Sequence, residues 1–87
     1  MSGGHFDYNQ YKIREIKDSI EQFIVDNDYN FLNSVLDEFK KGVKILAKAE
    51  IYVQRIDWLL SGDDGEETFL KRLREDLKEM EKEFNDY

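Results

Sequence analysis

The chain contains no proline in its 87 residues, and its apolar residues recur at steps of three and four. Proline breaks helices most strongly, and this spacing is the periodicity of an amphipathic helix. The five glycines are then the main interruptions. The sequence predicts an all-α fold of three helices: a short N-terminal helix, a long central helix and a charged C-terminal helix, packed as a helical hairpin or bundle in a homo-oligomer.

We expect the first helix to begin near Asp7, because Asp7 suits the N-cap and Gln10 follows at the spacing of a capping box. Phe6 and Tyr11 flank this cap at the spacing of a hydrophobic staple. The turn-forming residues 26–28 predict the end of the helix. Its apolar stripe consists of Ile13, Ile16, Ile20, Phe23 and Ile24.

The second helix is expected from about Asn30 to Leu60. Gly42 lies on its apolar side, where glycine costs about 1 kcal/mol relative to alanine. This position indicates a close helix crossing or a kink, or a glycine that is merely tolerated. Gly62 is placed to end the helix in left-handed geometry.

The third helix is expected to begin after Asp64, which with Glu67 has the spacing of a second capping box. Its apolar residues form one stripe, and its other faces are almost wholly charged. The stripe contains Phe69 or Leu70, Leu73, Leu77, Met80 and Phe84.

The chain is short enough to be a single domain, residues 1–87, with residues 1–6 as a flexible N-terminal segment. A chain of this size buries only about 60% of its unfolded surface. It has no cysteine for disulfides and one histidine, so a metal cluster is not expected. Self-association is the remaining source of stability. We predict an oligomer interface at Ile51, Trp58 and Leu59, which project away from the main apolar stripe.

The 20 acidic and 13 basic residues give a net charge of -7. This balance argues against binding to long nucleic acids, which requires lysine and arginine to neutralise phosphates. The longest apolar run is too short for a bilayer and the N-terminus has no signal-peptide pattern, so we expect a cytoplasmic protein without membrane partners. Phosphate-loop, dinucleotide-binding and Ser-His-Asp patterns are absent, so we expect neither an enzyme nor a cofactor.

Two surfaces are candidates for ligand binding. Tyr8 and Tyr11 fall outside the apolar arc of the first helix, beside Arg14, and can stack on a nucleobase while the guanidinium meets a phosphate. The alternative is a local staple with an exposed tyrosine. On the second helix, a basic stripe could hold a small anion or be an ordinary solvated face. This stripe consists of Lys41, Lys44, Lys48, Tyr52 and Arg55.

Two segments carry a family resemblance: residues 1–8, MSGGHFDY, and residues 54–65, QRIDWLLSGDDG. Together they resemble a family of small helical phage and prophage proteins, the anti-CBASS sponges. Members of that family bind the cyclic di- and trinucleotide messengers of bacterial immunity without cleaving them. The segments cover about a quarter of the chain.

The resemblance implies a homohexamer in the host bacterial cytoplasm, with cyclic nucleotides such as cyclic GMP-AMP or cyclic tri-AMP in pockets between protomers. It also implies an aromatic residue that stacks on a base, a role that Tyr8 or Tyr11 matches, with Phe6 beside them. Lys12, Arg14 and Arg55 are our choices from helix geometry for the phosphate-binding bases. The acidic turn after Asp26 lacks a lysine for such a pocket. The alternative function is an acidic interaction protein, such as a DNA mimic that inhibits a nuclease. The C-terminal residues 62–87, with ten acids, favour this alternative.

Overall fold

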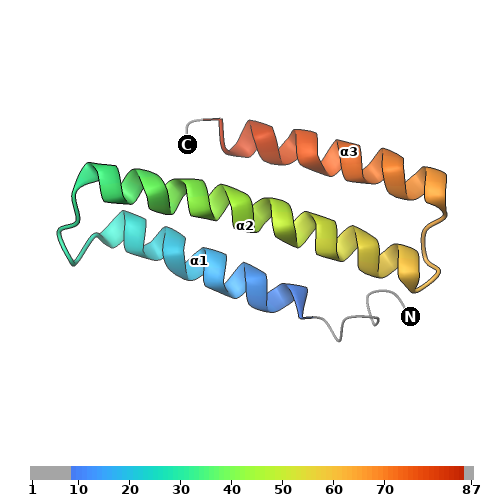
Figure 1. The fold of residues 1–87 in the computed structure, drawn as a ribbon, viewed down its shortest axis with the longest axis horizontal. Coiled ribbons are helices and arrows are strands. Elements are labelled where there is room, and N and C mark those ends of the chain that lie inside the picture. Colours follow the sequence, from blue (N-terminus) through green and yellow to red (C-terminus); the bar gives the residue numbers. More distant parts are fainter. Residues whose placement is uncertain (1–8, 86–87) are drawn as a thin grey trace.

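In the computed structural model, residues 9–85 are described, and they form three α-helices without a strand in that range. These are α1 (Gln10–Asp26), α2 (Asn33–Leu60) and α3 (Glu66–Glu83). The helix α2 lies in the middle, and α1 and α3 pack antiparallel against it without packing on each other (Figure 1). The result is a thin layer with dimensions of 47 × 25 × 13 Å. The prediction of three helices is confirmed, and their arrangement is open rather than closed into a bundle.

The start of α1 differs from the expected capping box. Asn9 is the N-cap residue and makes no side-chain capping hydrogen bond. Asp7, the expected cap, lies outside the described residues, as do Phe6 and Tyr8. The side chain of Gln10 does not cap α1 but forms hydrogen bonds with Gln54 and Asp57 of α2.

The loop between α1 and α2 is organised by Asn27, which ends α1 at the predicted place. Asn27 has left-handed backbone geometry, with φ of 42°, and its Oδ1 accepts a hydrogen bond of 2.9 Å from the Phe31 amide. The helix α2 begins three residues later than predicted, because Asn30 is also left-handed, with φ of 54°, and Leu32 is extended. Neither conformation continues a helix.

The turn between α2 and α3 confirms one prediction and corrects another. Gly62 follows α2 with φ of 84°, the left-handed geometry predicted for it. The carbonyl of Trp58 accepts hydrogen bonds from the amides of Asp63 and Asp64. The capping box at Asp64 is wrong: Gly65 is the N-cap of α3, without a side-chain hydrogen bond. The Asp64 carboxylate instead lies 3.7 Å from the Arg55 guanidinium.

The buried apolar core is small and lies mainly between α2 and α3. It contains Val43, Ala47, Met80 and Phe84, with Ile20, Ile24 and Ile51 packed against it. Ile51 follows Val43 and Ala47 at steps of four on α2, so it faces the core of its own protomer. The prediction that Ile51 projects away from the apolar stripe is therefore wrong.

Gly42 does not mark a close helix crossing. The helix α2 runs from Asn33 to Leu60 as a single element, without interruption at Gly42. A Cβ atom built on Gly42 would meet no other atom within 4 Å. Within the protomer, the close-packing explanation is therefore wrong, and the glycine is tolerated in open space.

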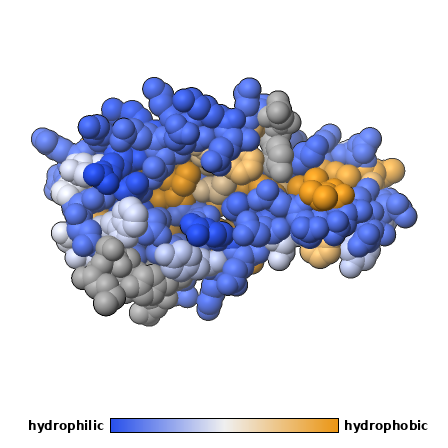
Figure 2. All heavy atoms as spheres, turned by 180° about the vertical axis from the view of Figure 1, so that it is seen from behind, coloured by the Kyte–Doolittle hydropathy of each residue, from blue (hydrophilic) through white to orange (hydrophobic). Residues whose placement is uncertain are grey.

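The end of the α1–α2 hairpin exposes a group of apolar side chains that we call the hairpin-end patch. Apolar surface is visible at this end of the molecule, on the right in Figure 2. Aromatic rings contact one another in series from Phe23 through Tyr29 and Phe31 to Phe39. The exposed members of the patch are Phe23, Val25, Tyr29, Phe31 and Leu32.

Across residues 9–85, no helix is long and apolar enough to cross a membrane.

Candidate ligand-binding site

The interface between α1 and α2 contains a buried polar network that joins the start of α1 to the end of α2. Gln10 Nε2 donates to Gln54 Oε1 at 2.9 Å and to Asp57 Oδ2 at 3.2 Å. The Ser61 hydroxyl donates to Asp57 Oδ1 at 3.4 Å. Gln10 and Asp57 are both fully buried, with 0% exposure. Because buried polar groups are costly without partners, these bonds fix the register of the two helices.

This network was not among the sequence predictions, although its polar residues stand at core positions of the two helix patterns. Gln10 and Lys17 are seven residues apart, and both lie on the same helix face as Ile20 and Ile24. On α2, Gln54 and Asp57 continue the stripe of Val43 and Ala47 at steps of three and four. Polar residues at core register are the signal that would have revealed it.

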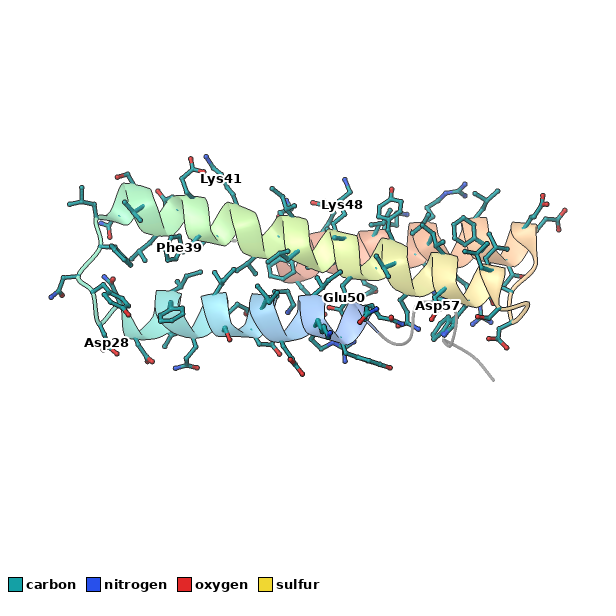
Figure 3. All side chains as sticks on the ribbon, turned by 60° about the horizontal axis from the view of Figure 1, so that its bottom comes forward. Asp28, Phe39, Lys41, Lys48, Glu50 and Asp57 are labelled. Atoms are coloured by element: carbon teal, nitrogen blue, oxygen red, sulfur yellow. The ribbon has the colours of Figure 1, made fainter. Side chains whose placement is uncertain are left out.

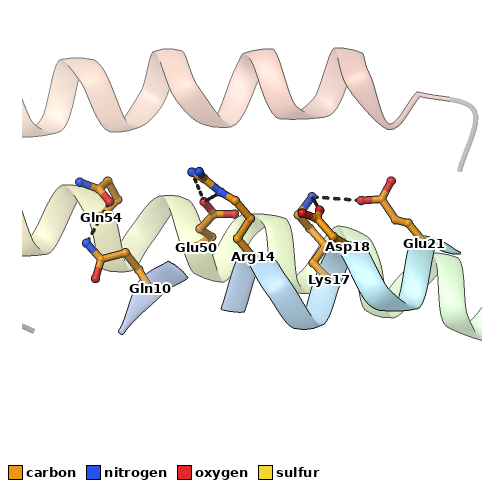
Figure 4. A network of polar contacts seen from close by, with 7 residues as sticks. All are labelled: Gln10, Arg14, Lys17, Asp18, Glu21, Glu50 and Gln54. Carbon is orange, nitrogen blue, oxygen red and sulfur yellow. Dashed lines mark hydrogen bonds and ion pairs between the residues drawn. The ribbon is translucent and has the colours of Figure 1, made fainter. Parts of the chain in front are cut away.

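Next along this interface, Arg14 and Glu50 form an ion pair between α1 and α2 (Figure 4). Arg14 Nε donates to Glu50 Oε2 at 2.7 Å. The Arg14 side chain is 53% exposed and that of Glu50 only 14%. The hydrogen bond to Glu50 raises the pKa of Arg14, although partial burial opposes this. The guanidinium is thus charged, held at one end and accessible from solvent.

Tyr11 lies beside Arg14 on the outer side of α1, as the sequence predicted. The guanidinium carbon of Arg14 is 5.3 Å from the centroid of the Tyr11 ring, within cation–π distance. Tyr11 is 44% exposed. Lys12 is exposed on the same helix. The structure therefore brings Tyr11 and Arg14 together and leaves part of the ring open to solvent.

Arg55 does not join this group, because it lies on the side of α2 that faces α3. Its Nε donates to Asp76 Oδ2 at 2.6 Å, and its guanidinium carbon lies 4.7 Å from the Trp58 ring centroid. Within the described chain, Asp64 is its second acidic neighbour. Arg55 is therefore committed to the α2–α3 corner of its own protomer, away from Tyr11 and Arg14, and its role as a phosphate-binding base stays a prediction.

Two of the five members of the basic stripe on α2 form ion pairs with α3. Lys44 forms an ion pair of 3.2 Å with Glu81, and Arg55 pairs with Asp76. Both acids belong to α3, so part of the stripe serves as its docking surface. The other three members, Lys41, Lys48 and Tyr52, are exposed, so an anion site and a solvated face both stay open for them.

Trp58 and Leu59, the other predicted interface residues, are half-buried within the protomer. Trp58 is covered on one side by Arg55, and its carbonyl anchors the α2–α3 turn. Their role in contacts between protomers stays a prediction.

A groove of about 250 Å³ lies between α1 and α3, floored by Ala47 and Ile51 of α2. Lys17 lines it from α1, and burial lowers the pKa of Lys17, but hydrogen bonds to Glu21 and Asp18 outweigh this and raise the pKa. The other charged side chains around the groove are carboxylates, so it repels small anions. These carboxylates belong to Glu50, Asp76, Glu79 and Glu83.

Within residues 9–85, no group of three or more histidine, cysteine, aspartate or glutamate side chains is arranged to hold a metal ion. Comparisons with known protein families, with characterised proteins and with solved structures find no match to this chain. The site must therefore be interpreted from its own geometry. The site has two parts: the Tyr11 ring with the Arg14 guanidinium on α1, and the acidic groove between α1 and α3.

Proposed function

We propose that the protein binds and sequesters cyclic di- or trinucleotide messengers without cleaving them, and so inhibits CBASS antiphage signalling. The observation that carries the proposal is the Tyr11–Arg14 pair, an exposed ring with a guanidinium 5.3 Å from its centroid. The sequence resemblance of residues 1–8 and 54–65 to anti-CBASS sponges supports the same function. These two lines of support are independent, because Tyr11 and Arg14 lie outside the two segments.

The chemistry of the pair suits a compact anion with flat bases. Stacking on an aromatic ring contributes about 1–3 kcal/mol per base. Arg14 can bind a phosphate if it exchanges Glu50 for the ligand. Exposed ion pairs contribute about 0.2–1 kcal/mol, and the cost here lies at or above the upper end of that range because the Glu50 side chain is only 14% exposed. The surrounding acidic surface disfavours long nucleic acids, which would bring many phosphates close to it.

Self-association is part of this proposal. A layer 13 Å thick leaves many apolar side chains exposed, and one protomer presents only one Tyr11–Arg14 pair. A symmetric assembly, which we propose to be a hexamer, would repeat the pair around a symmetric cyclic ligand. The hairpin-end patch is the best-exposed apolar surface for contacts between protomers, and the half-buried Trp58 and Leu59 are the second candidate.

The proposal is tested by isothermal titration with a panel of cyclic di- and trinucleotides, followed by denaturation and mass analysis of the ligand. We expect micromolar or tighter binding to at least one member and recovery of the intact ligand. Recovery of a linear nucleotide would instead identify hydrolysis. Analytical ultracentrifugation of the same sample checks the assembly, and a stable monomer would contradict the shared pocket.

An acidic interaction protein is the second candidate, and a specific observation favours it. The groove between α1 and α3 has four carboxylates around one lysine, and α3 adds further exposed acids such as Glu75 and Glu81. Such a surface suits a basic protein partner, for example a nuclease that normally binds DNA. Capture of a purified nuclease by a protein that binds no member of the cyclic nucleotide panel would decide for this candidate.

A further inference from the structure

On the side of α2 away from α1, three lysines surround an exposed isoleucine. Lys41, Lys44 and Lys48 follow one another at steps of three and four, and Ile45 lies between them on the same face. Figure 3 shows Lys41 and Lys48 directed away from α1. Together with Met80 and Glu81 of α3, these side chains line a hollow of about 340 Å³, a size within the range of small-ligand sites.

The floor of this hollow is apolar. Ile45 is 65% exposed, although its neighbours on this face are charged. Met80 belongs to the buried core and closes the hollow from the α3 side. An apolar body placed over Ile45 would remove that side chain from water, which contributes about 25 cal/mol per Å² of apolar surface buried.

The rim of the hollow is cationic and only partly neutralised. Lys44 pairs with Glu81 at 3.2 Å, and Lys41 pairs with Glu38 at 3.1 Å through exposed side chains. The ammonium group of Lys48 makes no hydrogen bond or ion pair with any residue from 9 to 85. The rim therefore offers at least one uncommitted ammonium group next to an apolar floor, in a protein that is acidic as a whole.

We propose that this hollow binds a small amphiphilic anion, a molecule with one phosphate, sulfate or carboxylate head on an apolar body. The body lies over Ile45 and Met80, and the head binds Lys48 with Lys44 or Lys41. This site is distinct from the Tyr11–Arg14 pair, which belongs to α1 on the other side of α2. It also differs from the acidic groove in its balance of charge: four carboxylates surround one lysine in the groove, whereas three lysines and one carboxylate, that of Glu81, line the hollow.

The test is a nuclear magnetic resonance titration of the full chain with hexyl phosphate. We expect saturable shifts for the amides around Ile45 and for the Met80 methyl group. Inorganic phosphate, 1-hexanol and hexyltrimethylammonium should each bind at least fivefold more weakly, because each lacks the anionic head or the apolar body. Equal binding of any of the three, or shifts located elsewhere on the protein, would overturn the proposal.

Three variants locate the site. Lys48→Gln removes the uncommitted cation and Ile45→Ser removes the apolar floor, and each should weaken hexyl phosphate binding at least fivefold. Both side chains are exposed, so the helical circular dichroism spectrum should be retained. Lys78→Gln is the matched control, because it removes the same charge from an exposed position on α3 outside the hollow. A loss of affinity in Lys78→Gln equal to that in Lys48→Gln would contradict a local site.

Discussion

Arg14 on α1 is held by Glu50 on α2, whose Oε2 accepts a hydrogen bond of 2.7 Å from the Arg14 Nε, while the guanidinium also lies beside the Tyr11 ring. Glu50 therefore has two opposing effects on ligand binding. It positions the Arg14 side chain in the free protein, but it also pairs with the guanidinium that would bind a phosphate.

This competition gives the first prediction. Replacing Glu50 by glutamine should strengthen cyclic nucleotide binding about fivefold, because Arg14 then gives up no ion pair to bind the ligand, and about 1 kcal/mol corresponds to a factor of about five. Titration calorimetry measures the effect. Glu15→Gln is the control, since Glu15 is exposed on α1, next to Arg14 in the chain, and makes no ion pair with residues 9–85. Weaker binding in Glu50→Gln would show that positioning of Arg14 by Glu50 matters more than competition between Glu50 and the phosphate. It would contradict the proposal that Arg14 exchanges Glu50 for the ligand.

The second prediction concerns the buried network. Asp57→Ala should lower the free energy of unfolding by about 1–3 kcal/mol, because it leaves the buried amide of Gln10 with fewer partners. Denaturant unfolding measures this change, with Asp63→Ala as the control at an exposed acid in the next turn. Equal stability of the two variants would show that the network does not support the α1–α2 interface.

The third prediction separates two glycines. Gly42→Ala should raise the free energy of unfolding by about 0.5–1 kcal/mol, because a Cβ atom there meets open space and alanine favours the helix. Gly62→Ala should lower it, because φ of 84° is strained for alanine. Thermal unfolding of both variants gives the comparison. A destabilised Gly42→Ala would indicate that another protomer packs closely at this position.

The fourth prediction follows from the raised pKa of Lys17. A group whose pKa is higher in the folded protein stabilises it fully below its unfolded pKa, here 10.5, and loses that contribution as pH rises through the higher folded value. The difference in unfolding free energy between the wild type and Lys17→Met should therefore be constant from pH 7 to about 9 and shrink above about 10.5. Denaturant unfolding across this range provides the measurement. A difference that grows with pH would contradict the ion pairs to Glu21 and Asp18.

The helices and their ends were largely predictable because they depend on local chemistry. Apolar spacing located α1, α2 and α3, and the conformational freedom of Asn27 and Gly62 set two of the ends. The start of α2 was misplaced because the loop uses a second left-handed residue, Asn30, which periodicity does not reveal. The Asp64 cap failed because α3 begins one residue later, with Gly65 as its N-cap, and the Asp64 carboxylate lies on the side of Arg55.

The candidate site was predictable only in part. The position of Tyr11 beside Arg14 follows from their spacing of three on one helix, so it was confirmed. The position of Arg55 depends on which face of α2 receives α3, and helix periodicity alone did not indicate that the basic stripe would meet Asp76 and Glu81. The partners of Gln10 likewise lie 44 and 47 residues away in the chain.

The most direct measurement of the central proposal is titration calorimetry of the wild type, Tyr11→Ala and Tyr52→Ala with the cyclic nucleotide panel. Tyr52 is the matched control because it is an exposed tyrosine on α2, outside the Tyr11–Arg14 pair. We predict binding of at least one member by the wild type, affinity lowered about 5- to 150-fold in Tyr11→Ala from the loss of stacking, and unchanged affinity in Tyr52→Ala. Absence of binding to every member by the wild type, or equal affinity in Tyr11→Ala, would contradict the account.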